Sequence, residues 1–220
     1  MSKIDVRPPR EPWVKLDITD DRAALAIYLS DPNTNVPIRD VSNKNDPKAD
    51  PNIETLTFGL FTYCHKQMRK NIVNNGIELL FFCTQRRDKY LNGDYEKTRA
   101  RRVLTGYYKI GWYYEVESGD FMLAAKSGKF VFPGFPLDSL STYLYGDNLD
   151  TKFYQWKYLH DRTPKLLSNL IDDTPDATQM YLSEISRLEE EAMSKYEFMY
   201  RKRTEGFTWL DAPRPMKLSQ

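Results

Sequence analysis

The hydrophobic pattern predicts several strands through the middle of the chain. Residues 56–63 are rich in β-forming residues and follow a turn-rich loop, which indicates a first strand. The near-continuous apolar run at 77–84 is typical of a central strand that is covered on both faces. Residues 101–116 carry the longest strand signal of the chain. These segments place a β-sheet at the centre of the fold.

Two shorter strands are expected after a turn that follows this long strand. The first is the apolar segment 121–125, which we expect residues 127–128 to break before a second strand at 130–132. A proline-rich segment then stops the strands, and one helical turn is expected to begin at Pro136. The sheet is therefore expected to end before the chain changes to helices.

Helical patterns flank the predicted sheet. Residues 64–75 suit a short helix that ends at Gly76. Apolar residues recur with helical spacing at 153–159, and a further helix is expected at 163–170. A stronger start signal stands at residues 174–176, where a capping threonine, a proline and an acid follow one another. The last helix is predicted to run from Asp176 to Arg203, with an apolar stripe formed by Tyr181, Ile185, Leu188, Ala192, Tyr196 and Met199.

The N-terminal part has weaker signals. Residues 24–29 suit either a strand or part of a short helix capped near Thr19, and periodicity does not decide between them. Residues 31–51 are rich in Asp, Asn and Pro, which predicts a long surface loop. We expect three regions in all: an N-terminal extension at 1–52, a compact β-barrel unit at 53–145 and a helical region packed on it at 146–220.

The long strand at 101–116 has one apolar and one mixed face when it is read with a period of two. The apolar face consists of Leu104, Gly106, Tyr108, Ile110, Trp112, Tyr114 and Val116. The mixed face consists of Val103, Thr105, Tyr107, Lys109, Gly111, Tyr113 and Glu115. Because large rings are the main apolar material of small sheets, we expect Phe81, Phe82, Tyr108 and Ile110 in the core.

Composition narrows the class of protein. The chain has 220 residues with 40% hydrophobic and 14% aromatic content, which is typical of a globular domain with a sizeable core. No apolar run is long enough to cross a bilayer, and the N-terminal residues lack the apolar core of a secretion signal. Cys64 and Cys83 lie in apolar segments, so we expect two buried thiols and a cytoplasmic protein.

Charge is distributed unevenly although the net charge is only +1. Between residues 64 and 103, ten basic side chains stand against four acidic ones, so this segment carries +6. Such a patch is either an ordinary solvated surface or a surface that contacts phosphates. The second interpretation gains support because the basic segment leads directly into the aromatic strand. Candidates for phosphate contact are Arg86, Arg87, Arg101 and Arg102.

Trp112 and Tyr113 have a second interpretation besides core packing. Gly111 precedes them and allows a ligand or another backbone to approach closely. Neighbouring strand residues face opposite ways, so one ring could pack in the core while the other lines a pocket. Aromatic rings beside cations are also what proteins use to hold bases near a phosphate backbone. Candidates for base stacking are Trp112, Tyr113 and Tyr63, with Thr62 and Cys64 near the mouth of the pocket.

Catalytic signals are weak. The chain has only two histidines, and no cluster of residues has metal-ligand spacing, so we expect neither a metal nor a cofactor. Cys64, His65 and Glu78 are the only reactive groups near the predicted pocket, and they represent the alternative of an enzyme that acts on a nucleotide or base. A second alternative is an assembly subunit that contacts a protein partner or a second copy through the helix at 176–203.

The order of the predicted elements suggests a family. A strand containing Phe58-Gly59-Leu60-Phe61-Thr62 leads into a short helix, a buried strand containing Leu79-Leu80-Phe81-Phe82 and a glycine-containing strand at 104–110. After a further strand comes the turn Phe135-Pro136-Leu137. This order resembles the PUA-like superfamily, with its EVE, YTH and ASCH domains, over residues 53–145. The resemblance implies a small curved mixed barrel in an α+β protein. It also implies recognition of a modified or extruded base of RNA or DNA in an aromatic pocket.

Overall fold

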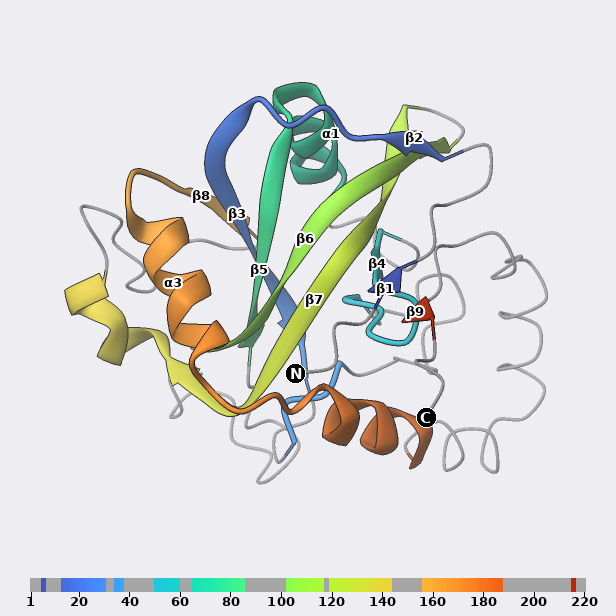
Figure 1. The fold of residues 1–220 in the computed structure, drawn as a ribbon. Helices are drawn as coiled ribbons and strands as arrows, with labels where there is room; N and C mark the ends of the chain where they lie inside the picture. Colours follow the sequence, from blue (N-terminus) through green and yellow to red (C-terminus); the bar gives the residue numbers. More distant parts are fainter. Residues whose placement is uncertain are drawn as a thin grey trace, which may run out of the picture.

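A computed structural model describes most of the chain. The described residues are 5–6, 13–30, 34–37, 50–59, 65–85, 102–116, 119–143, 156–187 and 215–216. They form an α+β protein that is built around one mixed sheet of seven strands (Figure 1). No helix among these residues combines the length and the apolar character needed to span a bilayer.

The elements follow one another in a simple order. The strands are β1 (Asp5–Val6), β2 (Val14–Lys15), β3 (Asp20–Leu29), β4 (Thr57–Phe58), β5 (Ile77–Gln85), β6 (Arg102–Val116), β7 (Asp120–Pro136), β8 (Trp156–Leu159) and β9 (Pro215–Met216). The helices are α1 (Lys66–Asn75), the 3-10 helix η1 (Leu137–Tyr143), α3 (Thr163–Asp172) and a helix at 178–187.

The main sheet has the strand order β4-β7-β6-β5-β3-β8, and β2 pairs with β6 beside this path. All neighbouring strands run antiparallel except β3 and β5, which are parallel. Within the described residues the sheet is open, with β4 and β8 as its end strands, so the closed barrel predicted from the sequence is not observed. The sheet also extends beyond residues 53–145, because β3 and β8 belong to it.

Both faces of the sheet are covered (Figure 1). On one face α1 and the helix at 178–187 pack against a core that contains Phe82, Tyr108 and Phe130. On the other face α3 and η1 pack against a core that contains Phe81, Leu104 and Val131. We call these the α1 face and the α3 face. Phe81 and Phe82 point to opposite faces, which confirms that β5 is a central strand covered on both sides.

Several predicted elements are confirmed. Helix α1 ends at Gly76, whose positive φ of 66° caps the helix in the left-handed conformation. Helix α3 begins with a proline in its first turn, as the sequence indicated. A helix after Asp176 is also confirmed, but it begins at 178, and Thr174 does not cap it, because the Thr174 hydroxyl donates a hydrogen bond to the carbonyl of Leu170. The Asp176 carboxylate accepts the hydrogen bond from the Thr178 N–H, at 2.9 Å. Residues 24–29, which periodicity left undecided, belong to β3.

Two predictions are wrong. Residues 156–159 form a strand paired with β3 rather than a helix, because Trp156 and Tyr158 share one face while Leu159 is buried on the other. Residues 127–128 do not break β7, which is continuous from Asp120 to Pro136. Gly128 has another role, since a Cβ there would lie 2.6 Å from Cδ1 of Tyr108. The glycine makes room for a buried ring and does not mark a turn.

A buried ion pair ties α1 to the β6–β7 turn. The guanidinium of Arg69 donates two hydrogen bonds from Nη2 to the two oxygens of Asp120, at 2.8 and 2.7 Å. The Arg69 side chain is only 1% exposed. Removing either partner of such a pair leaves an uncompensated buried charge, so the pair fixes the helix on the α1 face.

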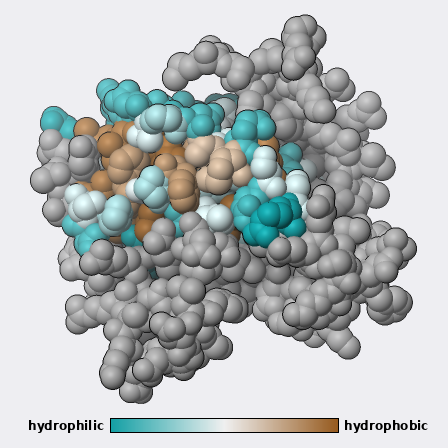
Figure 2. Space-filling model, turned by 90° about the horizontal axis from the view of Figure 1, so that it is seen from below, coloured by the Kyte–Doolittle hydropathy of each residue, from teal (hydrophilic) through white to brown (hydrophobic). Residues whose placement is uncertain are grey.

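Exposed large hydrophobic residues are few in the part of the chain that the structure describes. They are Val14, Ile18 and Phe132. Seen from below, hydrophobic residues gather in one area of the described surface, with hydrophilic residues beside them (Figure 2). Single exposed residues such as Val14, Ile18 and Phe132 are normal on globular proteins, so they do not mark a site by themselves.

Candidate functional site

Strand β6 changes at Gly111: even-numbered residues just before it point to the α1 face, and odd-numbered residues do so after it. Ile110 pairs with Ala125 and Trp112 pairs with Ala124, so Gly111 has no partner in β7. Lys126 of β7 likewise has no partner in β6, because Ser127 pairs with Lys109. This irregularity, which we call the bulge at Gly111, changes which side chains point to each face. Tyr108 and Ile110 therefore reach the α1 face before the bulge, whereas Tyr113 reaches it afterwards. The regular alternation predicted for 101–116 is therefore wrong. It changes here and also between Leu104 and Gly106, so that Leu104 lies on the α3 face.

Tyr113 belongs to the core. It packs against the cluster on the α1 face, and its ring lies edge-on to Phe121 with the ring centroids 5.8 Å apart. Trp112, its neighbour, therefore points to the opposite face. Both rings are half-buried, and of the two only Tyr113 packs against the core cluster of the α1 face.

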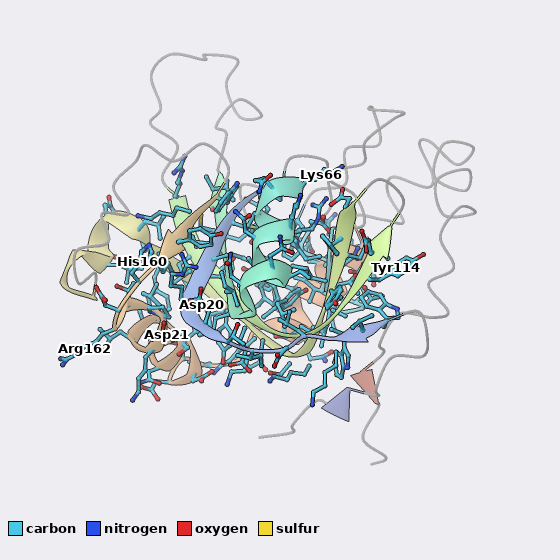
Figure 3. All side chains as sticks on the ribbon, turned by 90° about the horizontal axis from the view of Figure 1, so that it is seen from above. Asp20, Asp21, Lys66, Tyr114, His160 and Arg162 are labelled. Carbon is cyan, nitrogen blue, oxygen red and sulfur yellow. The ribbon has the colours of Figure 1, made fainter. Side chains whose placement is uncertain are left out.

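Trp112 lies in a small aromatic group with a lysine beside it. The exposed residue Lys15 of β2 is directly opposite Trp112, and residues opposite each other in an antiparallel pair share a face. Tyr114 follows two positions later, and its ring centroid lies 6.0 Å from that of Trp13. Trp13, Trp112 and Tyr114 are all half-buried. Figure 3 shows Tyr114 near the end of β6, pointing away from the sheet.

Further lysines continue along the same face of β6 and β7. Lys129 is directly opposite Tyr107, and Lys109 follows two positions after Tyr107 on the same strand. The Lys109 ammonium lies 6.0 Å from the centroid of the Tyr107 ring, which confirms that the two share a face. Lys126 lies beside Gly111, since a Cβ at 111 would come within 3.3 Å of the Cβ of Lys126. We call the whole set the lysine–aromatic face: Trp13, Lys15, Tyr107, Lys109, Trp112, Tyr114, Lys126 and Lys129.

Two acidic residues border this face. Glu78 forms an ion pair with Lys126, whose side chain is 41% exposed. Asp172, at the end of α3, accepts a hydrogen bond from the Tyr107 hydroxyl at 2.8 Å, and its backbone carbonyl accepts one from Lys129 at 2.7 Å. Burial and then the bond to Asp172 raise the pKa of Tyr107. Four lysines against two acids leave the lysine–aromatic face with a positive charge.

Of the four arginines predicted to contact phosphates, the structure describes only Arg102, and Arg102 does not lie near Trp112. Arg102 stands at the other end of β6, opposite Gln85. Ten residues of extended strand separate it from Trp112, a distance of roughly 30 Å. Arg86, Arg87 and Arg101 lie outside the described residues, as do the predicted pocket residues Thr62, Tyr63 and Cys64.

Of the three residues considered for catalysis, the structure describes His65 and Glu78, and these two contact different residues. His65 is buried and lies edge-on to Phe58 on the α1 face, with ring centroids 5.4 Å apart. Glu78 is paired with Lys126 as described above. Among the described residues, no group of three or more potential ligands could hold a metal ion. Cys83 is a buried thiol, and burial raises its pKa to about 12, which favours the protonated form.

A second polar cluster lies at the β3–β8 edge, on the opposite side of the molecule from Tyr114 (Figure 3). Arg22 forms a bidentate ion pair with Asp20 and lies over the Tyr158 ring, 4.8 Å from its centroid. Hydrogen bonding to Arg22 is the main reason why the pKa of Asp20 is lowered. These charges satisfy one another, which favours a structural role for this cluster.

The described part of the apolar stripe on the helix at 178–187 packs against the sheet inside the protein. Tyr181 and Ile185 are buried in the core of the α1 face, and the Tyr181 hydroxyl donates a hydrogen bond to the carbonyl of Val131 at 3.2 Å. The rest of the predicted helix, from 188 to 203, lies outside the described residues. A partner contact through that helix stays a prediction.

Sequence reasoning missed most of the lysine–aromatic face. Lys109 appeared on the mixed face of the long strand, but Trp13, Lys15, Lys126 and Lys129 were not recognised as site residues. The available signal was the short segment Trp13-Val14-Lys15-Leu16, in which Trp13 and Lys15 fall on one face when it is read as a strand. No protein-family model matches the chain, and no curated protein or solved structure matches it either.

Proposed function

We propose that this chain is a nucleic-acid-binding protein and that the lysine–aromatic face is its binding surface. In this proposal bases stack on Trp112, Tyr114 and Trp13, while Lys15, Lys109 and Lys129 contact phosphates. The observation that carries the proposal is the bulge at Gly111, because it turns Trp112 out of the core and places it beside Lys15.

The combination of rings and lysines favours nucleic acid over a protein partner. Lysine is depleted in the cores of protein–protein interfaces, where aromatic residues are otherwise common. Here lysines stand directly beside the rings, as in surfaces that bind bases and phosphates together. Stacking contributes about 1–3 kcal/mol per base, and each phosphate contact adds a salt-dependent term.

A finer part of the proposal concerns the kind of base. We propose a modified or extruded base as the preferred ligand, in a protein related to the PUA-like superfamily. Support comes from the predicted element order at 53–145 and from the half-buried ring of Trp112 next to a glycine. Oligonucleotides that differ only in one modified base test this part separately, since a preference for the modified oligonucleotide is expected.

Fluorescence anisotropy with a labelled oligonucleotide tests the main proposal. Trp112→Leu should weaken binding at least about fivefold, which corresponds to the lower limit of one lost stack. Trp156→Leu is the matched control, because Trp156 is also a half-buried tryptophan but lies on β8, against the α1-face core. Its binding should equal that of the wild type.

Salt dependence provides an independent measurement on the same samples. The logarithm of the binding constant should fall with the logarithm of salt concentration, and Lys15→Gln or Lys109→Gln should each reduce this slope by about 0.7–0.9. A salt-independent binding constant, or equal effects of the two tryptophan substitutions, would contradict the proposed surface.

A further inference from the structure

We infer that the ligand of the lysine–aromatic face is single-stranded nucleic acid, laid along β6 from Tyr114 toward Tyr107. This inference rests on the proposed function and specifies its substrate class. It is carried by the spacing of the rings, the spacing of the lysines and the position of α3.

The rings form a row that only unstacked bases can use. Trp112 and Tyr114 are two residues apart on one face of β6, which places them about 6.6 Å apart along the strand. The ring of Trp13 lies beside that of Tyr114, and the two planes are inclined by 48°. In a duplex each base face is covered by its neighbours at a rise of about 3.4 Å. Rings held on a sheet surface therefore reach base faces only where a strand is open.

The lysines continue this row along the strand. Lys15 is opposite Trp112, Lys109 lies further along β6, and Lys129 is opposite Tyr107. Lysines therefore lie along one face of β6. The seven steps of the strand from Tyr107 to Tyr114 span roughly 23 Å. A single backbone that follows β6 meets these charges in turn.

Helix α3 sets the end of this path. The Tyr107 hydroxyl and the Lys129 ammonium both donate hydrogen bonds to Asp172, the last residue of α3. The helix therefore meets the strand at Tyr107, which is buried in the core of the α3 face. The face available to a ligand extends from Lys109 to Tyr114. A path of this length suits a footprint at the lower end of the range of about 4–16 nucleotides seen for single-strand-binding folds.

The experiment compares single strands with a duplex, using the full-length chain. The probes are labelled oligothymidylates and oligouridylates of increasing length and a hairpin duplex with the same number of phosphates. At equal salt, a single strand should bind at least about tenfold more tightly than the duplex. Affinity per site should stop rising once the oligonucleotide covers the path from Tyr114 to Lys109.

Variants separate the inference from the proposed function. Trp112→Leu should weaken binding of the single strand and leave duplex binding unchanged. Lys109→Glu, an exchange at a half-buried surface position, should weaken both. Thermal unfolding of each variant shows whether it is folded, and Trp156→Leu should leave both affinities unchanged.

The contradicting outcomes differ for the two proposals. Equal or tighter binding of the duplex, with Lys109→Glu still weakening it, would overturn the single-strand inference and leave a phosphate-binding surface. Binding that neither Trp112→Leu nor Lys109→Glu affects, or no binding of any probe, would overturn the proposed function itself.

Discussion

The two stretches of β6 on either side of Gly111 have similar aromatic content and different surroundings. Before the bulge, Tyr108 is fully buried, and its hydroxyl donates a hydrogen bond to the carbonyl of Asn52 at 2.8 Å. After the bulge, Trp112 and Tyr114 are half-buried beside lysines. One irregularity in the pairing of β6 with β7 thus separates a stretch that stabilises the fold from one that we propose binds a ligand. Composition alone does not distinguish them.

The largest expected difference is in stability. Tyr108→Ala should lower the free energy of unfolding by about 3–5 kcal/mol, because it leaves a cavity in the core of the α1 face. Trp112→Leu should lower it by less than about 1.5 kcal/mol, since an apolar side chain replaces a half-exposed ring. Urea unfolding measures both values. Equal losses would show that Trp112 is a core residue and would remove the distinction between the two stretches.

Glycine substitutions give the next largest difference. Gly128→Ala should cost about 1–3 kcal/mol, because the new Cβ would lie 2.6 Å from the buried ring of Tyr108. Gly111→Ala should cost less, since its nearest neighbour would be the Cβ of Lys126 at 3.3 Å, a contact that a small shift of this exposed residue relieves. The ranking of the two midpoints in urea is the measurement. A reversed ranking would mean that the bulge, and not the ring contact, is the constrained position.

The buried stretch should also respond to alkaline pH. Burial raises the pKa of Tyr108 well above its usual value, so the folded state keeps a proton that the unfolded state loses above about pH 10. Stability from this group is complete below pH 10 and falls by about 1.4 kcal/mol per pH unit above it. Tyr108→Phe should therefore show a shallower decline of the unfolding free energy above pH 10. An unchanged decline would place the responsible tyrosine elsewhere.

The smallest effect concerns the exposed stretch and its ion pair. Glu78→Gln should strengthen oligonucleotide binding severalfold, because Lys126 would then be available to a phosphate instead of being paired with Glu78. One additional phosphate contact should make the salt slope steeper by about 0.7 for a single strand. Glu115→Gln is the control, since it removes an equal charge from an exposed residue of β6 on the side of Tyr113. An equal gain in both variants would indicate a general charge effect.

The sequence predicted elements well where a local pattern decides them. Helix α1 with its glycine cap and strand β5 both follow from short-range signals. It failed at Trp156–Leu159, because a four-residue strand has too few residues for its period to be distinguished from helical spacing. It failed at Gly128, because the reason for that glycine is the Tyr108 ring on a neighbouring strand.

The candidate site was predictable only in part, for the same physical reason. Trp112 stood out because a glycine precedes it, but its orientation depends on pairing between β6 and β7. Lys15 and Trp13 reach it through the pairing of β2 with β6, across nearly a hundred residues of chain. Contacts between such distant segments leave no local pattern, so the arginines closest in sequence appeared more important than lysines that are closer in space.

The place of β3 within the sheet has a consequence for biosynthesis. This strand leaves the ribosome before both of its partners, because its parallel partner β5 follows after a long connection and its antiparallel partner β8 follows β5, β6 and β7. Until then one edge of an apolar strand has no partner, which is the situation that promotes intermolecular strand pairing. Contacts of such long range also slow folding. A nascent chain that stops before Trp156 should therefore depend on chaperones more than the complete one.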